Sequence, residues 1–140
     1  YRIPANDCAC TPAGKGPTKT VPINRFNTRS FITSVQDGAK LKAGKEIVLR
    51  GIAFDGGQGI AEVSVSSDGG KTWQTAKLGE ELSKYSFREW KAAFKPAKKG
   101  HYELKVRAVN RAGQGQPIEA LWNPAGYMRN VVETVRVTAV

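Results

Sequence analysis

The chain has 140 residues, 40% of them hydrophobic, and a net charge of +10 from 22 lysines and arginines against 12 aspartates and glutamates. That length suffices for one domain with a hydrophobic core, and no apolar run approaches the roughly 20 residues that cross a bilayer. The charge suits an anionic substrate, an acidic partner, nucleic acid or a membrane surface, but the basic residues form no dense run, so we predict no nucleic-acid binding and no membrane insertion.

The first 28 residues hold four of the seven prolines and show no hydrophobic periodicity. Such a composition predicts an extended, irregular arm, either a linker or the tail of a preceding domain. We place the boundary there, with residues 1–28 as arm and 29–140 as folded domain. The sequence opens at Tyr1 without an initiator methionine or signal peptide, so we expect a processed product or a part of something longer.

Cys8 and Cys10 are separated by one residue, which makes a disulfide between them strained. Two thiols do not make a closed zinc site, and the only histidine, His101, is far away in sequence. We expect either free thiols or bonds to a segment outside this chain, and no metal site.

Alternating apolar residues predict strands in the first half of the domain. In residues 46–54 both faces carry apolar side chains, which indicates a strand covered on both sides for part of its length. The glycines of residues 55–59 break this strand, and Asp68-Gly69-Gly70 has the composition of a hairpin turn. The predicted strands here cover residues 29–34, 46–54, 61–66 and 72–76.

Residues 77–84 are polar and predict a loop, with a possible helical turn at residues 80–82. Residues 85–95 fit two patterns, because Trp90, Ala92 and Phe94 alternate as in a strand while Phe87, Trp90 and Phe94 have helical spacing. We choose a strand for the second half of this stretch, since proline and glycine follow it as in a hairpin connection. Further strands are predicted over residues 100–110 and 131–139.

Seven or eight short strands, with turn signals every ten residues or so, predict an all-β fold. The predicted architecture is an immunoglobulin-like antiparallel β-sandwich. Tyr102 stands two residues before Leu104, which takes the position of the antibody cysteine in the penultimate strand. No disulfide between the sheets is therefore expected.

The sequence contains few candidates for catalytic or metal-binding residues. One histidine cannot supply a base, its orienting partner and metal ligands, and no hydrolase, zincin or phosphate-loop motif occurs. Asp55 and Asp68 each precede Gly-Gly; carboxylates there are possible calcium ligands, but a turn role explains both. Three tryptophans either line a stacking platform or belong to the core and to an interface. They are Trp73, Trp90 and Trp122.

Six stretches, in order along the chain, point to one family. They are S-F-I-T-S at 30–34, G-I-A-F-D-G-G at 51–57 with Gly59-Ile60, V-S-V-S-S-D-G-G-K-T-W at 63–73, F-R-E-W at 87–90, R-A-V-N at 107–110 with Gln116-Pro117, and W-N-P-A-G-Y-M-R-N at 122–130. Together they resemble the C-terminal domain of molybdenum-dependent sulfite oxidases and sulfite dehydrogenases. The arm is most similar to that of the bacterial periplasmic sulfite dehydrogenases.

The resemblance implies an immunoglobulin-like domain that follows a molybdopterin-binding domain. It also implies a homodimer contact or, in some bacterial members, a c-type cytochrome subunit as partner, and a periplasmic location. In this family molybdenum is held by a dithiolene cofactor and a cysteine of the preceding domain, so neither Cys8 nor Cys10 is assigned that role. The whole enzyme converts sulfite to sulfate, and we expect this chain alone to be inactive, with no catalytic residue of its own.

One position departs from the family pattern. Vertebrate-type members carry an arginine in W-N-x-R-G that reaches toward the sulfite pocket, and Ala125 stands there in this sequence. Arg129 either replaces it as a contact to the substrate pocket or is a plain surface arginine. For the contact with a neighbouring subunit or domain we select Trp122, Asn123, Tyr127 and Asn130, because large rings in an irregular loop favour an interface.

Two rival functions remain on the sequence alone. A carbohydrate-binding sandwich would use exposed tryptophans, so the exposure of Trp73 and Trp90 discriminates it. Nonspecific nucleic-acid binding by the basic surface would show a steep salt dependence.

Overall fold

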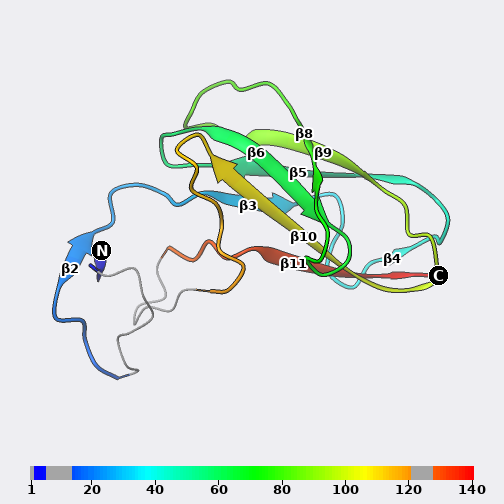
Figure 1. The fold of residues 1–140 in the computed structure, drawn as a ribbon, viewed down its shortest axis with the longest axis horizontal. Helices are drawn as coiled ribbons and strands as arrows, with labels where there is room; N and C mark the ends of the chain where they lie inside the picture. The colour runs from blue at the N-terminus through cyan, green and yellow to red at the C-terminus, as the bar shows by residue number, and fades with distance from the viewer. Residues whose placement is uncertain (1, 6–13, 121–127) are drawn as a thin grey trace.

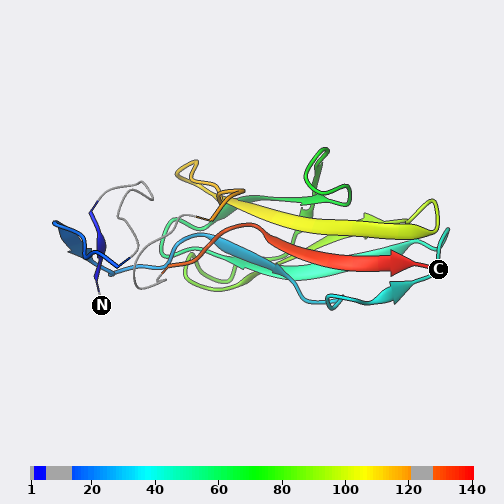
Figure 2. The ribbon, with the colours of Figure 1, turned by 90° about the horizontal axis from the view of Figure 1, so that it is seen from below.

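Two β-sheets are packed face to face along the long axis of the molecule (Figures 1 and 2). The structure is a computed structural model that describes residues 2–5, 14–120 and 128–140. One sheet has the strand order β4-β11-β10-β6-β7 and the other β3-β5-β9-β8, and every pairing is antiparallel except the parallel one between β11 and β4. The predicted all-β, immunoglobulin-like sandwich is confirmed.

The strands of the sandwich are short to medium in length. The first sheet contains β4 (Lys40–Leu41), β6 (Ile60–Ser66), β7 (Gln74–Thr75), β10 (Gly100–Asn110) and β11 (Glu133–Ala139). The second contains β3 (Arg29–Ile32), β5 (Ile47–Phe54), β8 (Lys77–Leu78) and β9 (Arg88–Phe94).

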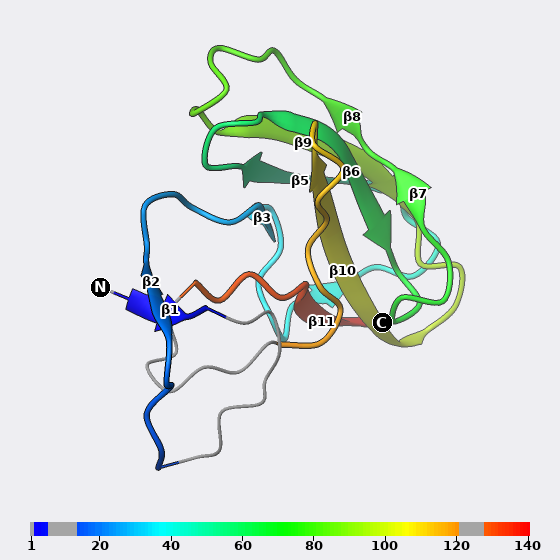
Figure 3. The same cartoon turned by 60° about the vertical axis from the view of Figure 1, so that its left-hand side comes forward.

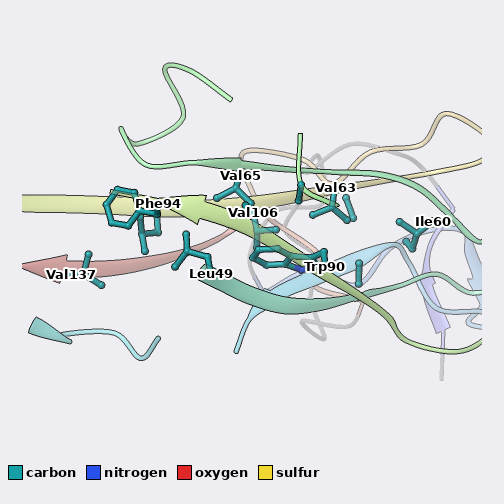
Figure 4. Packing of buried hydrophobic residues seen from close by; sticks show 13 residues of the cluster. Leu49, Ile60, Val63, Val65, Trp90, Phe94, Val106 and Val137 are labelled. Carbon is teal, nitrogen blue, oxygen red and sulfur yellow. The ribbon is translucent and has the colours of Figure 1, made fainter. Parts of the chain in front are cut away.

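The core lies between the two sheets and is centred on Trp90 (Figure 4). Trp90 is only 2% exposed, and its indole N–H donates to the Ile52 carbonyl 3.3 Å away. Leu49 of one sheet and Leu104 of the other belong to the same core cluster, and both are fully buried. Burying a side chain of this size contributes about 1.5–3 kcal/mol, so these contacts hold the layers together.

The ambiguous stretch at residues 85–95 forms a strand in its second half, as predicted. In β9, Trp90, Ala92 and Phe94 are buried while the residues between them are exposed. The helical alternative is wrong, because β9 pairs along its length with β5, from Ile47 opposite Phe94 to Ala53 opposite Arg88.

Residues 72–80 differ from the prediction in two ways. The return strand is reduced to β7, since the Asp68 carboxylate accepts the backbone N–H groups of Lys71 and Thr72 and keeps them in the turn. The chain then crosses to the other sheet as β8, where a polar loop was expected. No helical turn forms at residues 80–82. Two-residue strands give too short an alternation to be recognised in a sequence.

The arm contains a small sheet that was not predicted. β1 (Arg2–Pro4) pairs antiparallel with β2 (Thr20–Pro22) beside the N-terminus (Figure 3). The Arg2 guanidinium donates to the hydroxyl of Thr20 at 2.7 Å and to its carbonyl at 2.8 Å. The prolines are tolerated because they occupy strand ends in a two-stranded ribbon. The boundary at residue 28 stays a prediction.

Gly51 in β5 lies against the Trp90 ring, so replacing it tests the packing of the core. A Cβ atom built there meets the Phe31 carbonyl oxygen and the Trp90 ring, so the indole lies directly on the backbone of β5. We expect Gly51→Ala to lower the free energy of unfolding by at least about 1–3 kcal/mol through overpacking, measured by urea unfolding. The control is Gly16→Ala, because its Cβ would enter open space. Equal unfolding midpoints for both variants would contradict this packing.

Candidate functional site

Four segments meet at the end of the sandwich that adjoins the arm, opposite the C-terminus (Figure 1). They are residues 26–30, 55–59, 110–117 and 128–132. Five polar side chains, each at most 7% exposed, hold these segments together. We call them the anchor network: Thr28, Ser30, Asp55, Asn110 and Gln116.

The Asp55 carboxylate is the acceptor at the centre of one half of the network. One oxygen accepts the Thr28 hydroxyl at 2.5 Å and the Asn110 amide at 3.1 Å. The other accepts the backbone N–H groups of Gly57 at 3.1 Å and Gln58 at 2.7 Å. Burial raises the pKa of this carboxyl, but the hydrogen bonds, that of Thr28 first, outweigh burial and bring the pKa below its ordinary value of 3.8.

Gln116 is the centre of the other half. Its carbonyl oxygen accepts the Ser30 hydroxyl and the Ala108 backbone N–H, the latter at 3.0 Å. Its amide donates to the Asn130 carbonyl at 2.9 Å. One buried side chain thus ties the entry into the domain, strand β10 and the segment before β11 to each other.

Residues 128–130 are also fastened directly to the arm. The Asn27 side chain donates to the Met128 carbonyl at 3.2 Å, and the Asn130 side chain donates to the Thr28 carbonyl at 3.4 Å. Met128 has a φ of 59°, a left-handed conformation that is uncommon outside glycine. Such a conformation costs free energy and persists where surrounding contacts fix it.

The structure describes the positions of only some of the predicted site residues, and their roles stay predictions. Arg129 and Asn130 both lie at the anchor end. The Arg129 guanidinium is ion-paired with Glu133 and its side chain is 57% exposed; Glu133 also faces an Arg29 nitrogen at 3.4 Å. The remaining predicted residues lie outside the described ranges: Trp122, Asn123 and Tyr127 of the interface, with Ala125, Cys8 and Cys10.

The tryptophan platform and the metal alternative find little support. Trp90 belongs to the core, and Trp73 is half-buried with its indole N–H donating to the Gly70 carbonyl at 3.1 Å. Asp68 acts as a turn residue, because its carboxylate accepts the Thr72 hydroxyl and the backbone N–H groups of Thr72 and Lys71. These hydrogen bonds, that of the Thr72 hydroxyl first, hold the pKa of Asp68 well below its ordinary range. Among the described residues no group of three or more His, Cys, Asp or Glu is placed to hold a metal, and no helix is long and apolar enough to cross a membrane.

The sequence did not single out most of the anchor network. Asp55 was interpreted as a turn residue, which is correct but incomplete. Asn110 and Gln116 occur in the stretches that resemble the family, but only the spacing of Asn110 carries a signal of burial. Alternate residues of a strand point to the same side, so Asn110 shares the inward face of β10 with Leu104, Val106 and Ala108.

Asp55→Asn tests the electrostatic part of the network. Because the folded pKa lies below 3.8, the ionised carboxylate stabilises the fold above that pH, and this contribution is lost as the pH falls through the folded pKa. The asparagine amide would face the N–H groups of Gly57 and Gln58 instead. We expect the free energy of unfolding at pH 7 to fall by about 1–3 kcal/mol, with a smaller further loss below about pH 4 than in the unchanged chain.

Chemical unfolding between pH 3 and pH 7 measures this difference. Glu80→Gln removes the same charge from an exposed position outside the network and serves as the control. If both variants gave stability curves parallel to that of the unchanged chain, Asp55 would not carry the pH dependence.

The sequence of this chain is similar to a family model and to known proteins. The family model of the Mo-co oxidoreductase dimerisation domain matches residues 20–140. Mitochondrial sulfite oxidase of Rattus norvegicus is 34% identical over 126 residues, covering 84% of this chain and 23% of that protein. Sulfite oxidase of Arabidopsis thaliana is 33% identical over 115 residues, covering 74% of this chain and 29% of that protein.

A solved structure agrees with these matches. The sulfane dehydrogenase SoxCD from Paracoccus pantotrophus superposes with a TM-score of 0.63 at 29% identity, covering 78% of this chain and 29% of that one. The chain therefore spans less than a third of each of these three proteins. Since the family model matches the whole sandwich, this chain belongs to the Mo-co oxidoreductase dimerisation domain family.

Proposed function

We propose that this chain is the interface domain of a molybdenum enzyme that oxidises sulfite to sulfate and passes the two electrons to a cytochrome. The observation that carries the proposal is the family match over residues 20–140, supported by similarity to sulfite oxidases of animals and plants. Those relatives are several times longer, so we assign the molybdopterin and the redox chemistry that it supplies to another part of the full-length protein.

The role of this chain is to position a contact surface. The anchor network fixes residues 116–117 and 128–132 against the sheets and the arm, with further support from Val132, whose N–H donates to the Pro117 carbonyl at 2.9 Å. Because these residues are already held in place, binding a neighbour there costs little further conformational entropy. We therefore propose that Trp122, Asn123, Tyr127 and Asn130 contact the neighbouring domain or subunit.

Two partners are compatible with this role. A second copy of the protein would form a homodimer, as the family description implies, and a c-type cytochrome subunit would receive electrons directly. We place the enzyme in the periplasm, because the arm resembles that of the bacterial periplasmic enzymes. The net charge of +10 favours the approach of an anion such as sulfite, although exposed charges are largely screened beyond about 10 Å at 0.1 M salt.

The enzymatic proposal is tested on the full-length protein of which this chain is a part. We expect that protein to contain molybdenum and to reduce a c-type cytochrome only when sulfite is added. The 140-residue chain alone is expected to reduce none. Metal analysis and the absorbance change of the cytochrome measure both. A full-length protein without molybdenum, or one that contains molybdenum but ignores sulfite, would refute the proposal.

Arg129 provides a second test, on the substrate pocket. If its guanidinium leaves Glu133 and reaches a sulfite oxygen in the whole enzyme, it supplies charge-assisted hydrogen bonds. Arg129→Gln should then raise the KM for sulfite about tenfold, a loss of ~1.4 kcal/mol, with little change in kcat. Steady-state kinetics of the full-length enzyme measure this.

Arg136→Gln is the matched control, because Arg136 is also an exposed arginine and lies 3.7 Å from the Glu103 carboxylate. An unchanged KM in Arg129→Gln would identify Arg129 as a surface arginine. The same increase in both variants would assign the effect to overall charge and not to a contact.

A further inference from the structure

The outer faces of the two sheets differ in how their charges are arranged. On the five-stranded sheet, two directly opposed pairs interact favourably: Glu103 lies 3.7 Å from Arg136, and the Lys105 amine donates to the Thr134 hydroxyl at 2.8 Å. Complementary pairs of this kind suit a face that remains in water.

The four-stranded sheet carries a row of like charges instead. Its register places Arg50 of β5 directly opposite Lys91 of β9, and Lys91 directly opposite Lys77 of β8. All three side chains are exposed, and we call them the basic row. Directly opposed residues have Cβ atoms about 5 Å apart, where like charges destabilise a sheet. No member of the basic row takes part in an ion pair with another described residue, although Glu89 lies two positions from Lys91.

Apolar side chains flank the basic row on both sides. On one side the rings of Phe31, Phe54 and Phe87 follow one another, with centroids 6.3 Å and 5.7 Å apart, and Phe87 is 63% exposed. On the other side Val48, which is 46% exposed, lies opposite Ala93. Phe31 and Phe54 are half-buried, so Phe87 and Val48 are the exposed apolar side chains of this face. Exposed apolar surface rimmed by polar residues is typical of a contact with another molecule.

We propose that the outer face of β3, β5, β9 and β8 docks a protein partner with an acidic surface, whose carboxylates lie against the basic row and whose apolar side chains cover the flanking residues. The carboxylates of the partner would attract the three cations and so offset the repulsion among them. It would also remove Phe87 and Val48 from water. Charge complementarity across an interface speeds association and rejects wrong partners.

Other occupants fit this face less well. Three charges across two inter-strand gaps span only about 10 Å, which neutralises few phosphates of a nucleic acid and leaves the aromatic rings uncovered. A second copy would present the same row and the same net charge of +10, because a two-fold interface places identical patches on both sides. Such a contact leaves the basic row without enough carboxylates.

A zero-length carbodiimide reagent tests the proposal, since it joins a lysine amine only to a carboxylate in contact with it. The full-length protein would be treated in extracts of its own host, and the linked peptides would be identified by mass spectrometry. We expect Lys77 or Lys91 to be joined to an aspartate or glutamate of a different polypeptide. That polypeptide would then be purified and its Kd measured at several salt concentrations.

Charge reversal separates the basic row from the rest of the surface. We expect Lys77→Glu with Lys91→Glu to weaken binding at least tenfold and to flatten its salt dependence. The matched control, Lys98→Glu with Lys99→Glu, makes the same change of charge at exposed positions between β9 and β10 and should stay within twofold. Lys91→Gln is a milder second variant, expected to weaken binding about threefold, and thermal unfolding confirms that each variant is folded.

Several results would overturn the proposal. Crosslinks from other lysines with none from Lys77 or Lys91 would show that the face is free of acidic contacts. Crosslinks of these two lysines to a second copy of the chain would make the face a homodimer contact. Retention of the protein on phosphatidylglycerol vesicles or on duplex DNA, lost in the Lys77 and Lys91 double variant, would assign the row to a membrane or to nucleic acid.

Discussion

A buried carboxylate, that of Asp55, determines how the functional end of this domain is arranged. An ionised group at 7% exposure would be costly without partners. Here it accepts four hydrogen bonds, from the arm, from β10 and from its own glycine loop. These hydrogen bonds join the arm and the glycine loop to the end of strand β10. The Asp55 carboxylate therefore holds these segments together at one end of the sandwich, and the Gln116 amide joins Asn130 to the same end.

The sequence predicts those parts of the fold that depend on local alternation. Strands β5, β9 and β10 alternate over seven residues or more; periodicity predicts β5 and β10, while β9 also needed the proline and glycine that follow it. Strands β7 and β8 have two residues each, so their existence depends on which neighbours the sheets offer. The same holds for the anchor network: Gln116 is buried because Ser30 and Asn130 arrive from distant parts of the chain, and no local pattern records that meeting. Resemblance to a family located these residues without explaining them.

Arg129 shows how a charged residue at such an end can have two roles. Glu133 faces both Arg29 and Arg129, so two cations share one carboxylate. Exposed ion pairs of this kind contribute little, about 0–1 kcal/mol. Releasing Arg129 toward an anion would therefore cost little, and Arg29 would remain beside Glu133, with its guanidinium also 4.6 Å from the Phe31 ring centroid. The ion pair seen in the structure is thus compatible with a role in anion binding.

The outer faces of the two sheets also differ in how their charges are arranged. On the five-stranded sheet Glu103 lies opposite Arg136, whereas the four-stranded sheet opposes Arg50, Lys91 and Lys77 in register. Replacing one lysine by a polar residue would relieve the repulsion without disturbing the core, because all three side chains point away from it. The row opposes three like charges near the exposed ring of Phe87, which lowers the stability of the isolated domain slightly. That cost is the argument for the proposed partner, whose carboxylates would offset it.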